Sequence, residues 1–166
     1  NGGSAITDYV VESSPDSTTW TVFADGTSTT ASATVTGLTN GQAYTFRVSA
    51  TNVAGTGATS TVSAAVTPRT VPNAPTSVAG TAGNAQVSLT WTAPVSNGGS
   101  AITDYVVESS PDSTTWTVFA DGVSTAASAT VTGLTNGQAY TFRVSATNVA
   151  GTGATSVVSS AVTPRT

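Results

Sequence analysis

Residues 1–70 recur as residues 97–166 with only four differences, and this internal repeat constrains the fold more than any other feature. The four differences are Thr27 against Val123, Thr30 against Ala126, Thr61 against Val157, and Ala64 against Ser160. Solenoid proteins repeat every roughly 20–50 residues, so a longer repeat is expected to be a whole domain with its own core. The chain is therefore predicted to be part of a tandem array of domains.

The composition argues against several classes of function. Charged residues make up 7% of the chain, the net charge is −4, and no lysine occurs. Nucleic acids and anionic membrane surfaces bind clustered Lys and Arg, so neither is an expected partner. Cysteine and histidine are also absent, which excludes catalytic triads, thiol nucleophiles and ordinary zinc sites. We expect no enzyme activity, no cofactor, no metal and, for want of a long apolar run, no membrane insertion.

Alternating apolar and polar residues predict short, half-buried strands in residues 71–166. In residues 85–92, for example, Val87, Leu89 and Trp91 fall on one face and polar residues fall on the other. Turn residues separate such runs at regular spacing, and no helical periodicity occurs. Seven strands are expected, near residues 77–80, 85–92, 101–110, 116–120, 128–132, 139–148 and 156–163. This pattern is typical of an antiparallel two-sheet sandwich.

A set of spaced residues in this repeat forms a recognisable pattern. Its members are Trp91, Ile102, Tyr105, Leu134, Tyr140, Phe142, Val144, Ala146, Asn148 and Gly151. With the segments NGGSAITDY and VTGLTNGQAYTFRVSATN, they resemble the fibronectin type III domain in its bacterial style. The resemblance spans residues 71–166 and, from the third strand onward, residues 1–70. It implies an all-β, antiparallel, seven-stranded two-sheet sandwich (fibronectin-type-III-like and Ig-like) in a tandem array. Asn136 departs from the family, which often has Pro there.

The phase of the repeat predicts one incomplete and one complete domain. Residues 71–166 are expected to form a complete fibronectin-type-III-like domain. Residues 1–70 are expected to be an incomplete one that lacks its first two strands, because residues 71–96 have no counterpart before Asn1. We therefore expect the sequence to be a stretch of a longer chain. Unless other strands cover its inner face, the first unit is not expected to fold.

The junction between the units is rich in proline. Pro68, Pro72 and Pro75 lie within a short segment, and closely spaced prolines favour an extended, semi-rigid backbone. The sequence therefore favours a rod of domains with restricted joints.

The spacing of Leu134 and Tyr140 predicts a tyrosine corner, in which the Tyr hydroxyl bonds to backbone a few residues upstream. Leu38 and Tyr44 repeat this spacing in the first unit. The other aromatic residues expected to be structural are Trp91, Trp20 and Trp116. Because the resemblance gives every Trp, Tyr and Phe a core position, no exposed aromatic platform for carbohydrate is expected.

Asp104 and Glu108 alternate on the outward face of the third strand. An acid–base pair works in a cleft that shifts its pKa values, and an open sheet does not provide one. Both carboxylates are instead interpreted as cross-strand partners of Arg143.

Three polar turn residues raise the question of a calcium site: Asp112, Asp121 and Asn136. No D-x-D-x-D or nonapeptide spacing accompanies them, so too few ligands fall within one loop. Turn formation accounts for these residues without a metal.

The loop over residues 148–155 is the remaining candidate for ligand recognition. In fibronectin type III domains the equivalent loop between the last two strands can carry adhesive motifs. Here it has no charge, no aromatic residue and no RGD sequence, so a simple connection is favoured. Asn148, Gly151, Thr152 and Gly153 are its candidate contact residues.

Together these features favour a non-catalytic structural or spacer repeat of a long extracellular or cell-surface bacterial protein. Neighbouring copies of the same domain are the expected partners, and assembly into a filament or contact with cell-surface partners stays open. One alternative is an adhesion module that binds carbohydrate or protein. Another is a spacer domain of a secreted polysaccharide-degrading enzyme.

Overall fold

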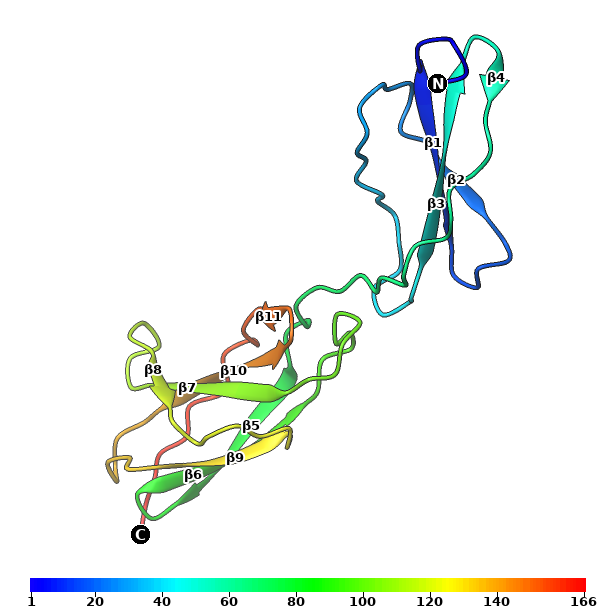
Figure 1. Ribbon diagram of the computed structural model, residues 1–166. Helices are drawn as coiled ribbons and strands as arrows, with labels where there is room; N and C mark the ends of the chain where they lie inside the picture. Colours follow the sequence, from blue (N-terminus) through cyan, green and yellow to red (C-terminus); the bar gives the residue numbers. More distant parts are fainter. The chain divides into compact units, whose positions relative to one another are not determined.

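The computed structural model describes residues 1–166, which form two compact units, residues 1–68 and residues 69–166. Every regular element is a β-strand, and no helix is present that could cross a membrane (Figure 1). The two units are called unit 1 and unit 2 below and are described separately.

Unit 2 is a sandwich of two antiparallel sheets (Figure 1). One sheet has the order β5–β6–β9, and the other has the order β11–β10–β7–β8. The strands are β5 (Thr76–Gly83), β6 (Gln86–Thr92), β7 (Asp104–Ser110), β8 (Thr117–Phe119), β9 (Ser128–Thr132), β10 (Thr141–Asn148) and β11 (Gly151–Thr152). The prediction of an all-β two-sheet sandwich is confirmed.

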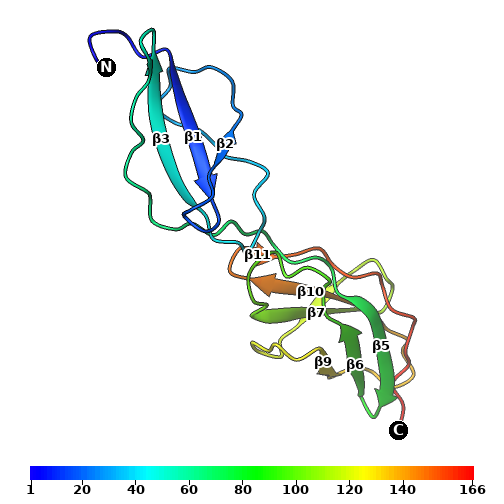
Figure 2. The ribbon, with the colours of Figure 1, turned by 90° about the vertical axis from the view of Figure 1, so that its right-hand side faces the viewer.

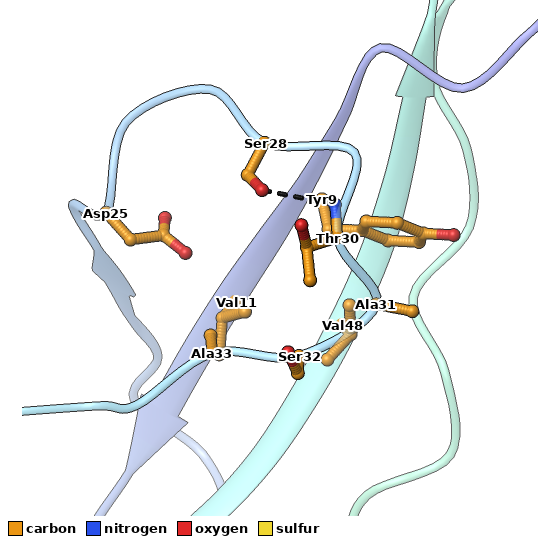
Figure 3. A pocket seen from close by; sticks show the side chains of 9 residues that line it. All are labelled: Tyr9, Val11, Asp25, Ser28, Thr30, Ala31, Ser32, Ala33 and Val48. Atoms are coloured by element: carbon orange, nitrogen blue, oxygen red, sulfur yellow. Dashed lines mark hydrogen bonds between the residues drawn. The ribbon is translucent and has the colours of Figure 1, made fainter.

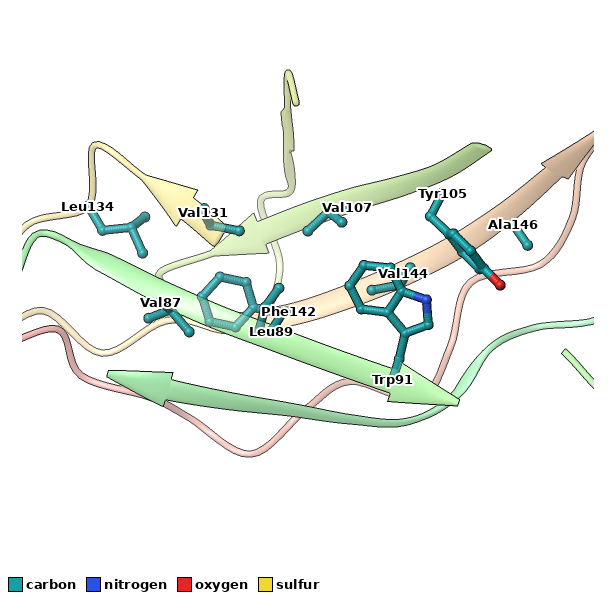
Figure 4. Close-up of a cluster of buried hydrophobic side chains, with 10 residues drawn as sticks. All are labelled: Val87, Leu89, Trp91, Tyr105, Val107, Val131, Leu134, Phe142, Val144 and Ala146. Carbon is teal, nitrogen blue, oxygen red and sulfur yellow. The ribbon is translucent and has the colours of Figure 1, made fainter. Parts of the chain in front are cut away.

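The core of unit 2 lies between the two sheets (Figure 4). Side chains alternate along a strand, so every second residue of β6, β7 and β10 enters this layer. The buried set is Val87, Leu89, Trp91, Tyr105, Val107, Val131, Leu134, Phe142, Val144 and Ala146. Full burial of one such aliphatic or aromatic side chain contributes about 1.5–3 kcal/mol. The three apolar residues of β6 thus supply one wall of the core.

Unit 1 has one sheet, of order β2–β1–β3–β4. Its strands are β1 (Asp8–Ser14), β2 (Thr21–Phe23), β3 (Thr45–Asn52) and β4 (Gly55–Thr56). They correspond residue for residue to β7, β8, β10 and β11. Residues 32–36, the counterpart of β9, form no strand and run as an irregular segment (Figure 2). In unit 2 this stretch is a strand because it pairs with β6, and unit 1 contains no such partner.

The seventh strand predicted at residues 156–163 is not formed. The amides of Ser156, Ser159 and Val162 donate to carbonyls of β10 or just before it, on Val144, Phe142 and Tyr140, all at 2.8 Å. This edge segment thus advances three residues for every two on its partner, so its side chains cannot alternate as in a strand. The hydroxyls of Ser156 and Ser159 accept the amides of Val144 and Phe142 instead. The prediction was wrong because side-chain acceptors replaced the regular backbone ladder.

Candidate functional site

The outer face of the larger sheet of unit 2 carries a stack of three side chains. Arg143 donates two hydrogen bonds to the carboxylate of Glu108, at 2.7 and 2.9 Å. Its guanidinium carbon lies 4.3 Å from the centre of the Trp116 ring. Unit 1 repeats this stack with Glu12, Arg47 and Trp20, at 4.2 Å.

Trp116 and Trp20 were expected in the core, but this stack places both rings on the outer face of the sheet. Phe119 faces the core and pairs with Val107, and side chains alternate along a strand. Trp116 is three residues away from Phe119 and therefore falls on the opposite, outward face. The spacing in the sequence is enough to predict this outward position. Each unit consequently has a half-buried aromatic ring on its outer surface.

The two outward carboxylates of β7 have different partners. Glu108 pairs with Arg143, as expected, whereas Asp104 accepts the backbone amide of Ser124 at 2.9 Å. Asp104 is therefore not a partner of Arg143. In unit 1, hydrogen bonds from Arg47 hold the pKa of Glu12 below its usual value. A carboxylate held ionised by arginine on an open face is a poor proton donor.

The turn residues considered for calcium have local roles in the structure. Asp112 accepts the amides of Thr114 and Thr115, at 2.8 and 2.7 Å, and the hydroxyl of Ser110 at 2.9 Å. These bonds hold the pKa of Asp112 well below its usual value, with the bond from Thr115 the largest cause. Such a carboxylate closes its own turn.

The other two calcium candidates, Asn136 and Asp121, lie in different loops. The Asn136 side chain accepts the amide of Ala85 and donates to the Asn84 side chain, each at 2.8 Å. Asp121 is exposed after β8. No group of three or more Asp, Glu, His or Cys side chains lies close enough together to hold a metal ion.

The two tyrosines singled out by spacing bond to backbone five residues upstream. The hydroxyl of Tyr140 accepts the amide of Thr135 at 3.3 Å, and that of Tyr44 accepts the amide of Thr39 at 3.2 Å. Leu134 is buried beneath the corner in unit 2. Leu38 is only half-buried in unit 1.

The candidate loop residues after β10 are largely used within unit 2. The side-chain Nδ2 of Asn148 donates to the backbone carbonyls of Thr70 and Asn97, at 2.8 and 2.7 Å, and Asn148 is 4% exposed. Gly153 packs against the Pro72 carbonyl, and Gly151 has a φ of 128°. Thr152 is exposed, and its hydroxyl bonds that of Thr147 at 2.9 Å. These contacts join the loop to the start of unit 2, so few groups of the loop are free to bind a ligand.

Unit 1 has an open apolar groove where unit 2 has its core. Part of this groove is a hollow of about 150 Å³ between β1, β3 and the segment after β2 (Figure 3). Tyr9, Val11 and Val48 line it from the sheet, and Ala31 and Ala33 line it from that segment. The groove continues along Val35, Leu38, Phe46 and Val66. The sequence predicts an uncovered inner face, whereas the shape of the groove depends on tertiary structure.

A family model for the fibronectin type III domain matches residues 1–66 and again residues 73–162. The chain belongs to the fibronectin type III family. The two matches place one family member in each compact unit, in tandem.

Two bacterial proteins are similar to this pair of fibronectin type III domains. Chitinase A1 of Niallia circulans is 38% identical over 144 residues, which cover 81% of this chain and 19% of the chitinase. Endoglucanase B of Cellulomonas fimi is 40% identical over 157 residues, which cover 88% of this chain and 14% of the endoglucanase. The chain thus spans less than a fifth of either relative.

A solved structure of titin domains A168–A170 has a similar fold. It matches with a TM-score of 0.62 and 25% identity, over 96% of this chain and 55% of the titin chain. This likeness agrees with tandem β-sandwich domains.

Proposed function

We propose that the chain is a non-catalytic spacer in a secreted bacterial polysaccharide-degrading enzyme. The observation that carries this proposal is the match of both fibronectin type III units to a small part of a chitinase and of an endoglucanase. In this proposal the catalytic residues belong to other parts of such a protein, and the chain lies outside the cell. The same spacer role in a cell-surface protein is the more general form of this proposal.

The side-chain inventory supports a non-catalytic role. The chain has no histidine or cysteine, and the only ion pairs, Glu12–Arg47 and Glu108–Arg143, lie on outer sheet faces. The buried set of unit 2 contains no charged residue. No described group has the geometry of a nucleophile beside a base.

The outward tryptophans support a second candidate, a carbohydrate-binding module. Trp20 and Trp116 each present a half-buried ring next to an arginine–carboxylate pair. Sugar rings pack on aromatic faces, and paired charges supply hydrogen bonds at the edge of such a platform. However, the arginine already occupies one face of each ring, which favours a structural role for the stack.

A pull-down with insoluble polysaccharide separates the two roles. The 166-residue chain would be mixed with chitin and, separately, with cellulose, and the protein left in solution measured. A spacer stays in solution on both. The double variant Trp20→Ala/Trp116→Ala is the matched control. If the polysaccharide binds the parent chain but not the double variant, the chain is a binding module and not a spacer. Binding of both proteins would also contradict the spacer role.

A further inference from the structure

We propose that residues 70–73 form a strap of unit 2 whose contacts with two loops protect the chain from proteases. The two loops are residues 96–99 and residues 148–153. Cleavage after Arg69 then requires local release of the strap from these loops, and not unfolding of the whole unit. The hydrogen bonds of the strap, its packing and the position of Arg69 each support the proposal, which is independent of the spacer role.

Hydrogen bonds from both loops hold the strap. The Thr70 amide donates to the Gly98 carbonyl, and the Asn73 amide donates to the Ser96 carbonyl, each at 2.9 Å. The Thr70 carbonyl accepts a bond from the buried side chain of Asn148 at 2.8 Å. Both backbone groups of Thr70 are therefore bound within unit 2. Release of this residue breaks one bond to each loop.

Two glycines allow the loops to approach the strap closely. A Cβ added at Gly98 would be 2.0 Å from the Thr70 carbonyl oxygen, and one at Gly153 would be 2.0 Å from that of Pro72. A side chain at either glycine would therefore push the strap away, because no atom fits at such a distance.

The prolines of this segment are part of the fold of unit 2. The sequence favours an extended, semi-rigid backbone here because prolines are closely spaced. In the structure Pro72 and Pro75 are buried. The segment is therefore held by packing as well as by the restricted backbone angles of proline.

Arg69 is the residue at which a protease would attack the strap. It is exposed and belongs to neither ion pair, whereas Arg47 and Arg143 lie within strands β3 and β10. Trypsin cleaves after Arg or Lys, and the chain has no lysine. A protease must bind the residues on both sides of the bond that it cuts, so it needs Thr70 free of the loops. Cleavage then follows the population in which the strap is open.

The first test exposes the full 166-residue chain to trypsin and measures the new chain ends by mass spectrometry. A synthetic peptide of residues 62–77 carries the same bond without the loops. We expect the folded chain to be cut after Arg69 at least about a hundredfold more slowly than the peptide. Equal rates would overturn the proposal.

A matched pair of variants tests the contact with the second loop. Gly153→Ala places a methyl group against the Pro72 carbonyl and should speed cleavage after Arg69 at least about tenfold. Gly57→Ala is the control, because a Cβ at this equivalent position of unit 1 has the Ala50 carbonyl oxygen at 3.6 Å as its nearest neighbour. It should leave the rate after Arg69 unchanged.

Asn148→Ala is a second variant, which removes the bond to the Thr70 carbonyl and should also speed cleavage after Arg69. Cleavage after Arg143, in the middle of β10, reports unfolding of the whole unit and should stay slow in both variants. The proposal is wrong if neither variant is cut faster after Arg69, or if Gly57→Ala speeds this cleavage as much. Equal acceleration after Arg69 and Arg143 in both variants would show that the strap opens only with the whole unit, and would also overturn it.

Discussion

Single side chains in this chain act mainly by closing turns and edges. Tyr140 bonds back to Thr135, Asp112 caps its own turn, and Arg143 stacks between Glu108 and Trp116. An exposed stack of this kind contributes about 0.5–1 kcal/mol. Substitutions of these residues are therefore expected to change the stability of the fold and not a catalytic step.

Tyr140→Phe tests the tyrosine corner. The substitution removes the acceptor of the Thr135 amide while leaving the ring in place. Because the bond is 3.3 Å long and partly exposed, we expect unit 2 to lose about 0.5–1.5 kcal/mol of unfolding free energy. Chemical denaturation measures the loss. A change within experimental error would show that water replaces the hydroxyl.

Asp112→Asn tests the link between the turn and pH. The ordinary pKa of this group is 3.8, and hydrogen bonds in the folded turn lower it. As the pH falls below about 4, the unfolded chain takes up a proton before the folded one does, so the stabilisation is lost on acidification. The variant cannot take up this proton. Its stability should therefore fall less steeply between about pH 4 and pH 2 than that of the parent.

Denaturation of the variant and of the parent at both ends of that range checks the prediction. Identical slopes for Asp112→Asn and the parent would contradict the role of the turn.

At the scale of the elements, the strand edges are completed by side chains as well as by backbone. The segment after β11 runs beside β10 and bonds to it at every third residue. Its serine hydroxyls accept backbone amides of β10. This arrangement satisfies an edge without presenting a regular strand for further pairing, which limits edge-to-edge association.

Ser156→Ala tests this edge. Its hydroxyl accepts the Val144 amide at 3.0 Å in a buried position. Without it the amide has no partner, and we expect a loss of about 1–3 kcal/mol in the stability of unit 2. Ser160→Ala is the control, because Ala64 occupies the same position in unit 1. Equal stabilities of the two variants, measured by thermal or chemical denaturation, would show that water satisfies the amide.

At the scale of the whole molecule, two nearly identical sequences give units of unequal burial. Phe142 and Val144 are fully buried in unit 2, while Phe46 and Val48 are half-buried in unit 1. Less apolar burial leaves less to offset the conformational entropy of folding. The two units should therefore differ in stability.

Native-state amide exchange tests this difference with a built-in control. β1 and β7 have the same sequence, as do β3 and β10, so their intrinsic exchange rates match. We expect exchange to be faster in β1 and β3, because local opening of unit 1 exposes less apolar surface. Equal protection of both pairs in a monomeric chain would contradict the prediction.

The sequence by itself determined the fold class, the inward faces of the main strands and the pairing of Glu108 with Arg143. These follow from period-two alternation and repeat spacing, which are local properties of a strand. Only the tertiary structure decided that Arg143 stacks on the Trp116 ring, that Asp104 accepts the Ser124 amide, and that the segment after β11 bonds in three-residue steps. It also decided that residues 32–36 are irregular in unit 1, while residues 128–132, which have the same sequence, form a strand in unit 2. A strand's hydrogen bonds are made to a neighbour distant in the chain, so the same residues fold differently when that neighbour is absent.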